Sequence, residues 1–127
     1  MYKLFFLHFI ADFVLQSREM GKKKSSEAKW LLSHLAIQFL VFIPFTNWKF
    51  ALVNTIIHGF IDSNIWNGYK ALAFWRIKQN PQHPLLILND DFQDRWKYWD
   101  DHLFYTFIGL DQMLHGLTLI YVASKFL

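Results

Sequence analysis

The residues of this chain that could do chemistry are histidines and aspartates set at helical spacing within apolar sequence. Six of them form three pairs whose members lie four positions apart, and the seventh is an isolated histidine. The seven are His8, Asp12, His34, His58, Asp62, Asp111 and His115. A separation of four places both members of a pair on one face of an α-helix, one turn apart.

Imidazole nitrogens and carboxylate oxygens are ligands for zinc, manganese and iron. Seven candidates exceed the four of a structural zinc site, which indicates two metals with bridging carboxylates, or one metal with neighbours that orient its ligands. We expect zinc, with manganese or iron as alternatives, and one or two ions. Asp12 or Asp62 could act as a catalytic base instead of a ligand.

Other polar side chains share these helix faces. Gln38 follows His34 by four positions and could hold a ligand or bind substrate. The candidate substrate contacts are Gln16, Lys24, Asn54 and Gln112. An ionisable group at membrane depth costs about 2.5–3.5 kcal/mol on insertion scales, so such groups are usually functional. A proton or ion path, and polar contacts that only join helices, are the alternatives to a metal site.

The sequence around these residues, which must form the elements that position them, is rich in apolar residues. Of the 127 residues, 54% are hydrophobic and 18% charged, against roughly 45–50% and 25% in ordinary soluble domains. This composition excludes a disordered chain or a nucleic-acid-binding tail, and we expect no nucleic-acid partner. With 0 cysteines, a disulfide scaffold, a thiolate zinc site and a cysteine nucleophile are excluded.

The apolar residues form four blocks. These are Tyr2–Leu15, Trp30–Phe45, Trp48–Trp66 and Leu103–Leu127. A membrane-spanning helix needs about 20 mostly apolar residues, which the second and fourth blocks reach with their flanks. The first is short, and the third contains polar residues. We predict an all-α fold, an integral-membrane antiparallel four-helix bundle, as one domain over residues 1–127. A soluble helical protein with a large core is the rival, disfavoured by the nearly neutral link after the second block.

Lysine and arginine indicate an orientation. They collect in the first connection, Arg18–Lys29, and in the third, Lys70–Asp101. The positive-inside rule places both in the cytoplasm, as in a multi-pass protein of the bacterial inner membrane. We expect the third helix to end near Gly68 and a polar loop to cover about residues 77–101. We expect His83 and His102 to be solvated or capping, and a set of loop aspartates to form a hydrated face. These are Asp90, Asp91, Asp94, Asp100 and Asp101.

The run His8-Phe-Ile-Ala-Asp12-Phe-Val-Leu-Gln16 resembles the H-x-x-x-D-F-x-x-Q opening of the bacterial and phage membrane proteins grouped as domain of unknown function 3307. Further residues follow that family's order over essentially the whole chain. They are Lys24, His34, His58-x-x-x-Asp62 and Asp111-Gln112-x-x-His115. The polar insertion around Gln79–Asp101 departs from it. The resemblance implies an integral membrane bundle and no particular reaction.

The His-x-x-x-Asp pairs are also similar to those of membrane-bound metal-dependent hydrolases and, more distantly, of zinc-dependent phospholipase C and nucleases. This similarity implies metal-assisted phosphoester hydrolysis. We therefore expect a membrane-embedded metal-dependent hydrolase of a phospholipid or another membrane-associated phosphoester, with the lipid bilayer as partner. A transporter or channel for protons or a divalent ion is one alternative. A structural or regulatory membrane protein whose polar loop binds a partner is another.

Overall fold

The computed structural model describes residues 1–24, 27–83 and 97–127, and within these ranges every regular element is helical. The all-α prediction is confirmed for this part of the chain. The elements are α1 (Tyr2–Phe9), the π-helix η1 (Ile10–Val14), α2 (Arg18–Lys23), α3 (Ala28–Phe42), the 3-10 helix η2 (Ile43–Phe45), α4 (Trp48–Gln79), the 3-10 helix η4 (Tyr98–Asp100) and α5 (His102–Phe126).

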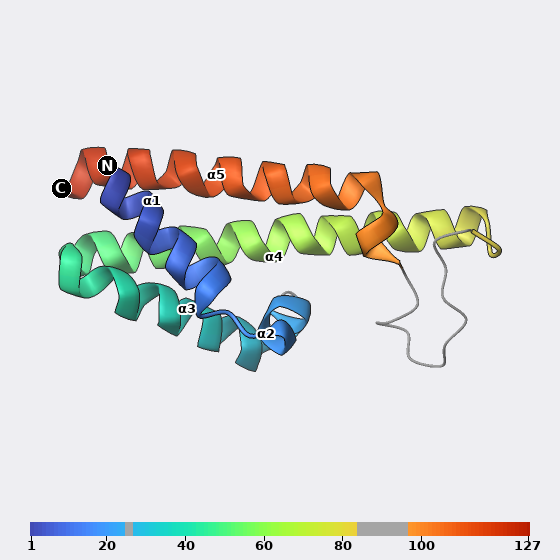
Figure 1. Cartoon of the computed structure of the whole chain (residues 1–127), viewed down its shortest axis with the longest axis horizontal. Coiled ribbons are helices and arrows are strands. Elements are labelled where there is room, and N and C mark those ends of the chain that lie inside the picture. The colour runs from blue at the N-terminus through green and yellow to red at the C-terminus, as the bar shows by residue number, and fades with distance from the viewer. Residues whose placement is uncertain (25–26, 84–96) are drawn as a thin grey trace.

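The helices form an elongated bundle (Figure 1). The long helices α3, α4 and α5 run back and forth along the bundle, and α4 packs against both of the others. The first helix crosses the bundle obliquely, and both chain termini lie at the same end (Figure 1). Because α1 contacts both α3 and α5, it can contribute side chains to the same interior as α3, α4 and α5.

Local sequence explains where α3 and α4 meet. Pro44 lies in η2 and lacks the backbone N–H that would continue α3. The side chain of Asn47 then caps α4 by accepting a hydrogen bond from Phe50 N at 2.9 Å. The same amide donates to Phe126 O at 2.7 Å, which ties the start of α4 to the end of α5.

The predicted end of the third helix near Gly68 is wrong, because the corresponding helix, α4, continues to Gln79. Glycine costs a helix interior only about 1 kcal/mol, and Tyr69 is buried against Phe104 and Phe107 of α5. Aromatic packing between the helices therefore continues beyond Gly68. The polar connection begins only at Asn80, and most of the loop expected at 77–101 lies outside the described residues.

The connection between η1 and α3, which was expected to be a polar link, is itself partly helical. It contains the short helix α2, whose N-cap Ser17 accepts a hydrogen bond from Met20 N at 3.1 Å. The preceding segment leaves α-helical geometry at Ile10 and forms a π-helix, closed by a bond from Leu15 N to Ile10 O at 2.9 Å. Such π turns are frequent at functional sites.

The buried interior of the bundle contains nearly as many polar as hydrophobic side chains. Among the described residues, 13 hydrophobic and 12 polar or charged side chains are buried. Many large hydrophobic side chains face outward, such as Phe60 at 72% exposure and Leu40 at 64%. Two helical segments, Ala28–Phe45 and His102–Phe126, are long and apolar enough to cross a membrane. The hydrophobic core that does exist centres on Phe42, Phe50, Leu119 and Val122.

Candidate metal centre

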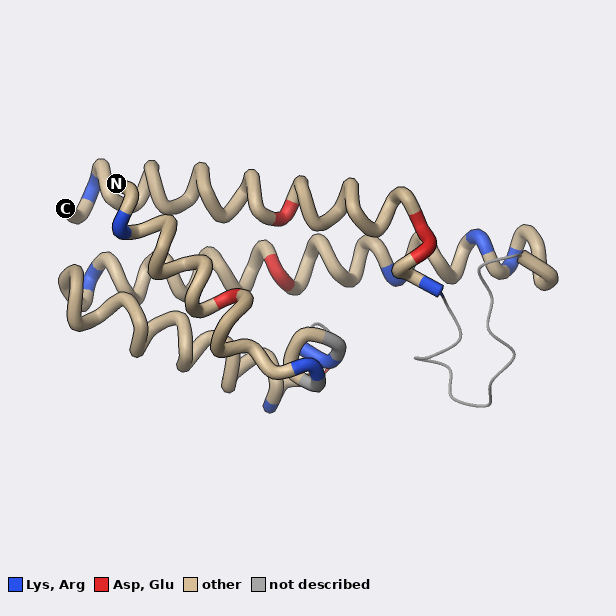
Figure 2. Tube along the Cα trace, in the orientation of Figure 1, with Lys and Arg blue, Asp and Glu red and all other residues tan. Residues whose placement is uncertain are grey.

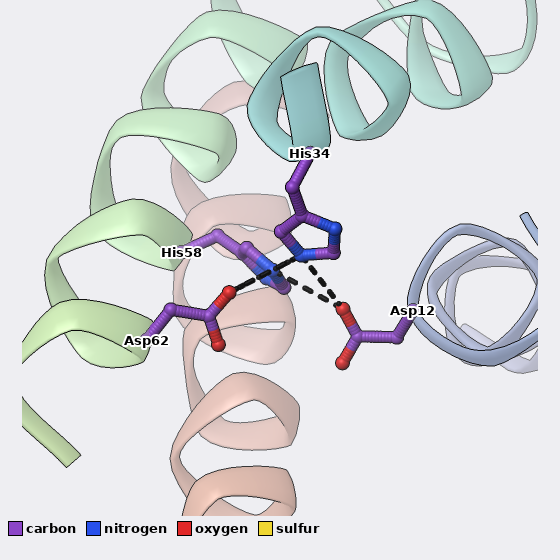
Figure 3. Close-up of side chains that lie close together, drawn as sticks. All are labelled: Asp12, His34, His58 and Asp62. Atoms are coloured by element: carbon purple, nitrogen blue, oxygen red, sulfur yellow. Dashed lines mark hydrogen bonds and ion pairs between the residues drawn. The ribbon is translucent and has the colours of Figure 1, made fainter. Parts of the chain in front are cut away.

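Five elements deliver the seven predicted residues to one buried cluster. His8 belongs to α1, Asp12 to the π-helix η1, His34 to α3, His58 and Asp62 to α4, and Asp111 and His115 to α5. Figure 3 shows Asp12, His34, His58 and Asp62 pointing toward one another, with His58 and Asp62 on the same helix, α4. Each of the seven is 5% exposed or less. The structure therefore brings the seven together, while their role as ligands stays a prediction.

The predicted spacing is confirmed as contact within each pair. His8 Nε2 lies 3.5 Å from Asp12 Oδ2. His58 Nε2 lies 3.3 Å from Asp62 Oδ2. His115 Nε2 lies 3.4 Å from Asp111 Oδ1. One helical turn thus joins each His to its Asp, including the pair that enters the π-helix.

A compact group of four donor atoms forms between the helices. His34 Nε2 lies 2.9 Å from His58 Nε2, 3.1 Å from Asp12 Oδ1 and 3.1 Å from Asp62 Oδ2. His58 Nε2 lies 3.2 Å from the same Asp12 oxygen. A tetrahedral zinc ion with bonds of about 2.0–2.1 Å separates its ligand atoms by about 3.3 Å. The donors therefore already stand at separations close to those that a metal ion imposes.

These separations do not distinguish between metals. Neighbouring ligands of an octahedral ion with bonds of about 2.1 Å lie about 3.0 Å apart, which the measured range also covers. The donor set is more informative, because two imidazoles and two carboxylates suit zinc, manganese or iron better than calcium or magnesium. The residues fit a divalent transition metal.

A second group of possible ligands shares Asp12 with the first. Asp12, Asp111 and His115 each offer a ligand atom within 4.8 Å of the others. The two groups are also linked through Asp62, since His115 Nε2 lies 3.3 Å from Asp62 Oδ1. The His58 and His115 rings are stacked with centroids 3.9 Å apart. The cluster is thus continuous, and a carboxylate lies where two ions could share it.

Two amides fix the shared carboxylate. Gln38 Nε2 donates to Asp12 Oδ1 at 3.0 Å. Gln112 Nε2 lies within 3.2 Å of Asp12 Oδ2 and of Asp111 Oδ2, and Gln112 Oε1 lies 3.3 Å from His8 Nε2. Hydrogen bonds of this kind orient ligands around a metal. The structure therefore places Gln112, expected as a substrate contact, against candidate ligands.

The other three expected substrate contacts differ in where they lie relative to the cluster. Lys24 is buried, and its Nζ lies 3.0 Å from Asp62 Oδ2, so it is an ion-pair partner within the cluster. Asn54 is buried on α4 one turn before His58. Gln16 is half-buried near Gly21 of α2, where a β-carbon would lie 3.0 Å from Gln16 Nε2. Their roles toward a substrate stay predictions.

The expected hydrated face of aspartates is wrong for Asp101. Asp101 is 4% exposed, and its Oδ2 accepts hydrogen bonds from Tyr69 Oη and from Arg76 Nη1, both at 2.8 Å. Its Oδ1 accepts from Leu103 N and caps α5. Burial raises the pKa of Asp101, but these hydrogen bonds and the charge of Arg76 lower it further, to below its usual range.

The other residues expected to be solvated or capping have different degrees of exposure. Asp100 is exposed, as expected, and His102 is exposed at the first position of α5. His83 is half-buried. The other three aspartates of that face, Asp90, Asp91 and Asp94, lie outside the described residues. The sequence signal for Asp101 was its place two positions before the apolar block that begins at Leu103, which is typical of a helix N-cap.

The fold and the cluster define a small helical-bundle protein with buried His and Asp groups that could hold a metal ion. Comparison with family models matches residues 1–127 to the family described as "Protein of unknown function (DUF3307)", and the chain belongs to that family. Comparison with curated proteins and with solved structures gives no match.

Proposed function

We propose that this protein is a membrane-embedded, metal-dependent hydrolase that acts on a phospholipid or another membrane-associated phosphoester. The observation that carries the proposal is the pair of donor groups sharing Asp12. A carboxylate shared between two metal positions is the arrangement expected of a centre that binds two ions, and two-ion centres are common in phosphoester hydrolysis.

The membrane part of the proposal is supported by the outward apolar surface. Monomeric soluble proteins rarely expose large contiguous apolar patches, whereas α3 and α5 direct residues such as Leu32, Leu40, Leu117 and Ile120 outward. Only 17% of each candidate span is buried inside the protein, which is unlike the core helix of a soluble domain. We infer that lipid covers this surface.

The charge distribution supports an orientation. Figure 2 shows Lys and Arg positions at the end with the termini, around α2 near the middle of the bundle's length, and toward the far end of α4. The end with the termini has Lys3, Lys49 and Lys125, whereas α2 with its flanks and the distal half of α4 have more. By the positive-inside rule, the α2 end faces the cytoplasm of a bacterial inner membrane.

The chemistry follows from what each residue contributes. His34 and His58 would hold the ion, and the two oxygens of Asp12 would serve the two donor groups. A divalent ion bound here would lower the pKa of a water molecule and neutralise charge on phosphoryl oxygens. The amide of Gln112 keeps the Asp12 carboxylate in place by its 3.2 Å hydrogen bond. The candidate base is Asp62, or Asp12 in place of its role as a ligand.

A lipid substrate is supported by an apolar groove on the seam between α1 and α3. The groove has a volume of about 430 Å³ and is lined by Lys3, Phe6, Leu7, Ile10, Leu40, Val41, Pro44 and Phe45. This volume lies within the range of about 300–1,000 Å³ for small-molecule sites. Ile10 belongs to the π-helix η1, so the groove runs along the element that also carries Asp12.

The burial of the donors favours a second candidate, in which the metal only stabilises the bundle. His34 and Asp62 are 0% exposed, and His58 is 1% exposed. A closed site with four protein ligands is typical of structural zinc. This candidate predicts bound metal, as the first does, but no turnover.

One experiment separates these candidates. The full chain is purified in detergent, its bound metals are measured, and it is loaded with Zn²⁺ or Mn²⁺. It is then mixed with phospholipid micelles while release of water-soluble phosphate or phosphorylated headgroup is followed. We expect metal binding and release by the wild type, and neither property at comparable strength in Asp62→Asn. Metal binding without release would contradict the hydrolase and support the structural candidate, and absence of both would contradict each.

A further inference from the structure

Lys24 lies inside the candidate metal centre, among its His and Asp side chains. Its side chain is 6% exposed, and its Nζ lies 3.0 Å from Asp62 Oδ2. A buried ammonium is costly unless it is paired and hydrogen-bonded. Lys24 is therefore held in the cluster by the carboxylate it neutralises.

The Asp62 oxygen that contacts Lys24 belongs to the four-donor group. Asp62 Oδ2 also lies 3.1 Å from His34 Nε2 and 3.3 Å from His58 Nε2. A cation at that group and the ammonium of Lys24 would thus contact the same oxygen. Because both would be positively charged and poorly solvated, the ion and the ammonium would repel one another.

The net charge of the cluster favours one divalent ion over two. Metal ligation requires ionised carboxylates and neutral imidazoles. The three aspartates of the cluster then contribute −3 and Lys24 contributes +1, for a net charge of −2. One divalent ion makes the buried cluster neutral, whereas a second leaves it at +2, and a buried net charge is unfavourable.

We propose that Lys24 is a built-in counter-ion that limits the centre to one divalent ion until an anion of the phosphate class binds. The anion supplies the negative charge that the second ion requires, and the shared Asp12 accommodates that ion beside the first. This inference rests on the proposed function, because a phosphoester is such an anion. It makes Lys24 a determinant of metal stoichiometry and of the order of binding.

The position of Lys24 at the end of α2 suits this role. The helix packs against α3 and is joined to the bundle through its two ends. Lys24 N donates to Met20 O at 2.9 Å, so the residue is the C-cap of α2. Its charge can thus be changed by substitution without altering the helices that provide the candidate ligands.

The test is equilibrium dialysis of the detergent-purified full chain against Mn²⁺, alone and with inorganic phosphate below its precipitation limit. The wild type is expected to bind one ion per chain without phosphate and two with it. Lys24→Met, whose cluster has a net charge of −1 with one ion and +1 with two, is expected to bind a second ion without phosphate at lower free Mn²⁺ than the wild type. It is expected to bind its first ion at least about tenfold more tightly. Lys24→Arg, which keeps the charge, is expected to bind one without phosphate.

The outcomes separate this inference from the proposed function. If the wild type binds Mn²⁺ but Lys24→Met matches it in stoichiometry and affinity, the inference is wrong and the metal centre stands. If only Lys24→Met binds, Lys24 occupies the place of the cation, which supports a counter-ion but contradicts a metal centre in the wild type. If neither binds, both are wrong.

A folding control accompanies the dialysis. Removing Lys24 leaves the buried carboxylate of Asp62 without its lysine partner, so metal-free Lys24→Met is expected to have a lower Tm than the wild type. Mn²⁺ is expected to restore that Tm, because the ion supplies the missing positive charge. A Tm that is lowered equally with and without Mn²⁺ would contradict the role of Lys24 as a counter-ion.

Discussion

His34 Nε2 and His58 Nε2 lie 2.9 Å apart, although the two residues are 24 positions apart in sequence and belong to different helices. Two neutral imidazoles can face one another in this way only if one of the nitrogens donates a proton to the other. A metal ion between them would use both nitrogens as ligands. The contact therefore marks the place where loss of either ring should have the largest effect on metal binding.

We predict that His58→Ala lowers the affinity for Zn²⁺ or Mn²⁺ by more than about 100-fold, beyond the about 10–100-fold typical of residues that only orient ligands. The reason is that His58 contacts both carboxylates of the four-donor group as well as His34. Titration of the detergent-purified protein with each metal measures the change. His102→Ala is the matched control, because His102 is an exposed histidine. Equal affinities in the two variants would show that His58 is no ligand.

Gln112→Ala should have a smaller effect, a loss of about 10–100-fold in metal affinity. Its amide contacts His8, Asp12 and Asp111, so its removal frees the shared carboxylate to rotate without removing a candidate ligand. The same titrations measure this loss, and Gln79→Ala on the exposed end of α4 is the control. A Gln112→Ala protein with wild-type affinity would mean that Gln112 does not orient the site.

Gly59 keeps α3 and α4 close beside the cluster. A β-carbon at Gly59 would lie 2.8 Å from Leu35 Cδ1 and 3.4 Å from Leu35 Cγ, so the leucine must move. We predict that Gly59→Ala lowers the free energy of unfolding by about 1–3 kcal/mol, and that adding Leu35→Ala recovers part of the loss.

Gly109 provides the matched control, since a β-carbon there meets nothing within 4 Å. Gly109→Ala should leave stability unchanged or raise it by up to about 1 kcal/mol, the helix-propensity difference. Thermal unfolding in detergent compares the variants. A Gly59→Ala protein as stable as Gly109→Ala would show that the close approach to Leu35 has no energetic consequence.

Asp101, which lies at the end of the bundle remote from the termini, should make the free energy of unfolding depend on pH. Its pKa in the folded protein lies below that of an unperturbed aspartate, which is about 3.9. Between these two values the unfolded state binds more protons, so stability rises with pH there. The contribution is fully present above about pH 4–5 and is lost as the pH falls through the folded pKa.

The variant Asp101→Asn tests this expectation. It should lose about 1–2 kcal/mol at neutral pH, because the cap of α5 and the bond from Arg76 are weakened. Its Tm should also vary less with pH below about pH 5 than that of the wild type. Asp100→Asn, at the exposed neighbouring position, is the control. Parallel Tm profiles for wild type and Asp101→Asn would contradict the assignment.

The sequence by itself determined the helical class and the identity of the cluster. Apolar blocks interrupted by His and Asp at a spacing of four predict helices with one polar face, and every such pair is in contact in the structure. That result follows because the i to i+4 relation is local to one helix and needs no knowledge of its neighbours. The family was also identifiable, since the opening motif from His8 to Gln16 is a continuous run.

Only the tertiary structure decided which atoms meet across helices. The approach of His34 to His58, the sharing of Asp12 between two donor groups and the ion pair of Lys24 with Asp62 depend on helix rotation, crossing and the π turn at Ile10. Sequence spacing within one helix contains none of these quantities. The same reason explains the errors at Gly68 and Asp101, where contacts between α4 and α5 outweigh the local polarity from which a loop was predicted.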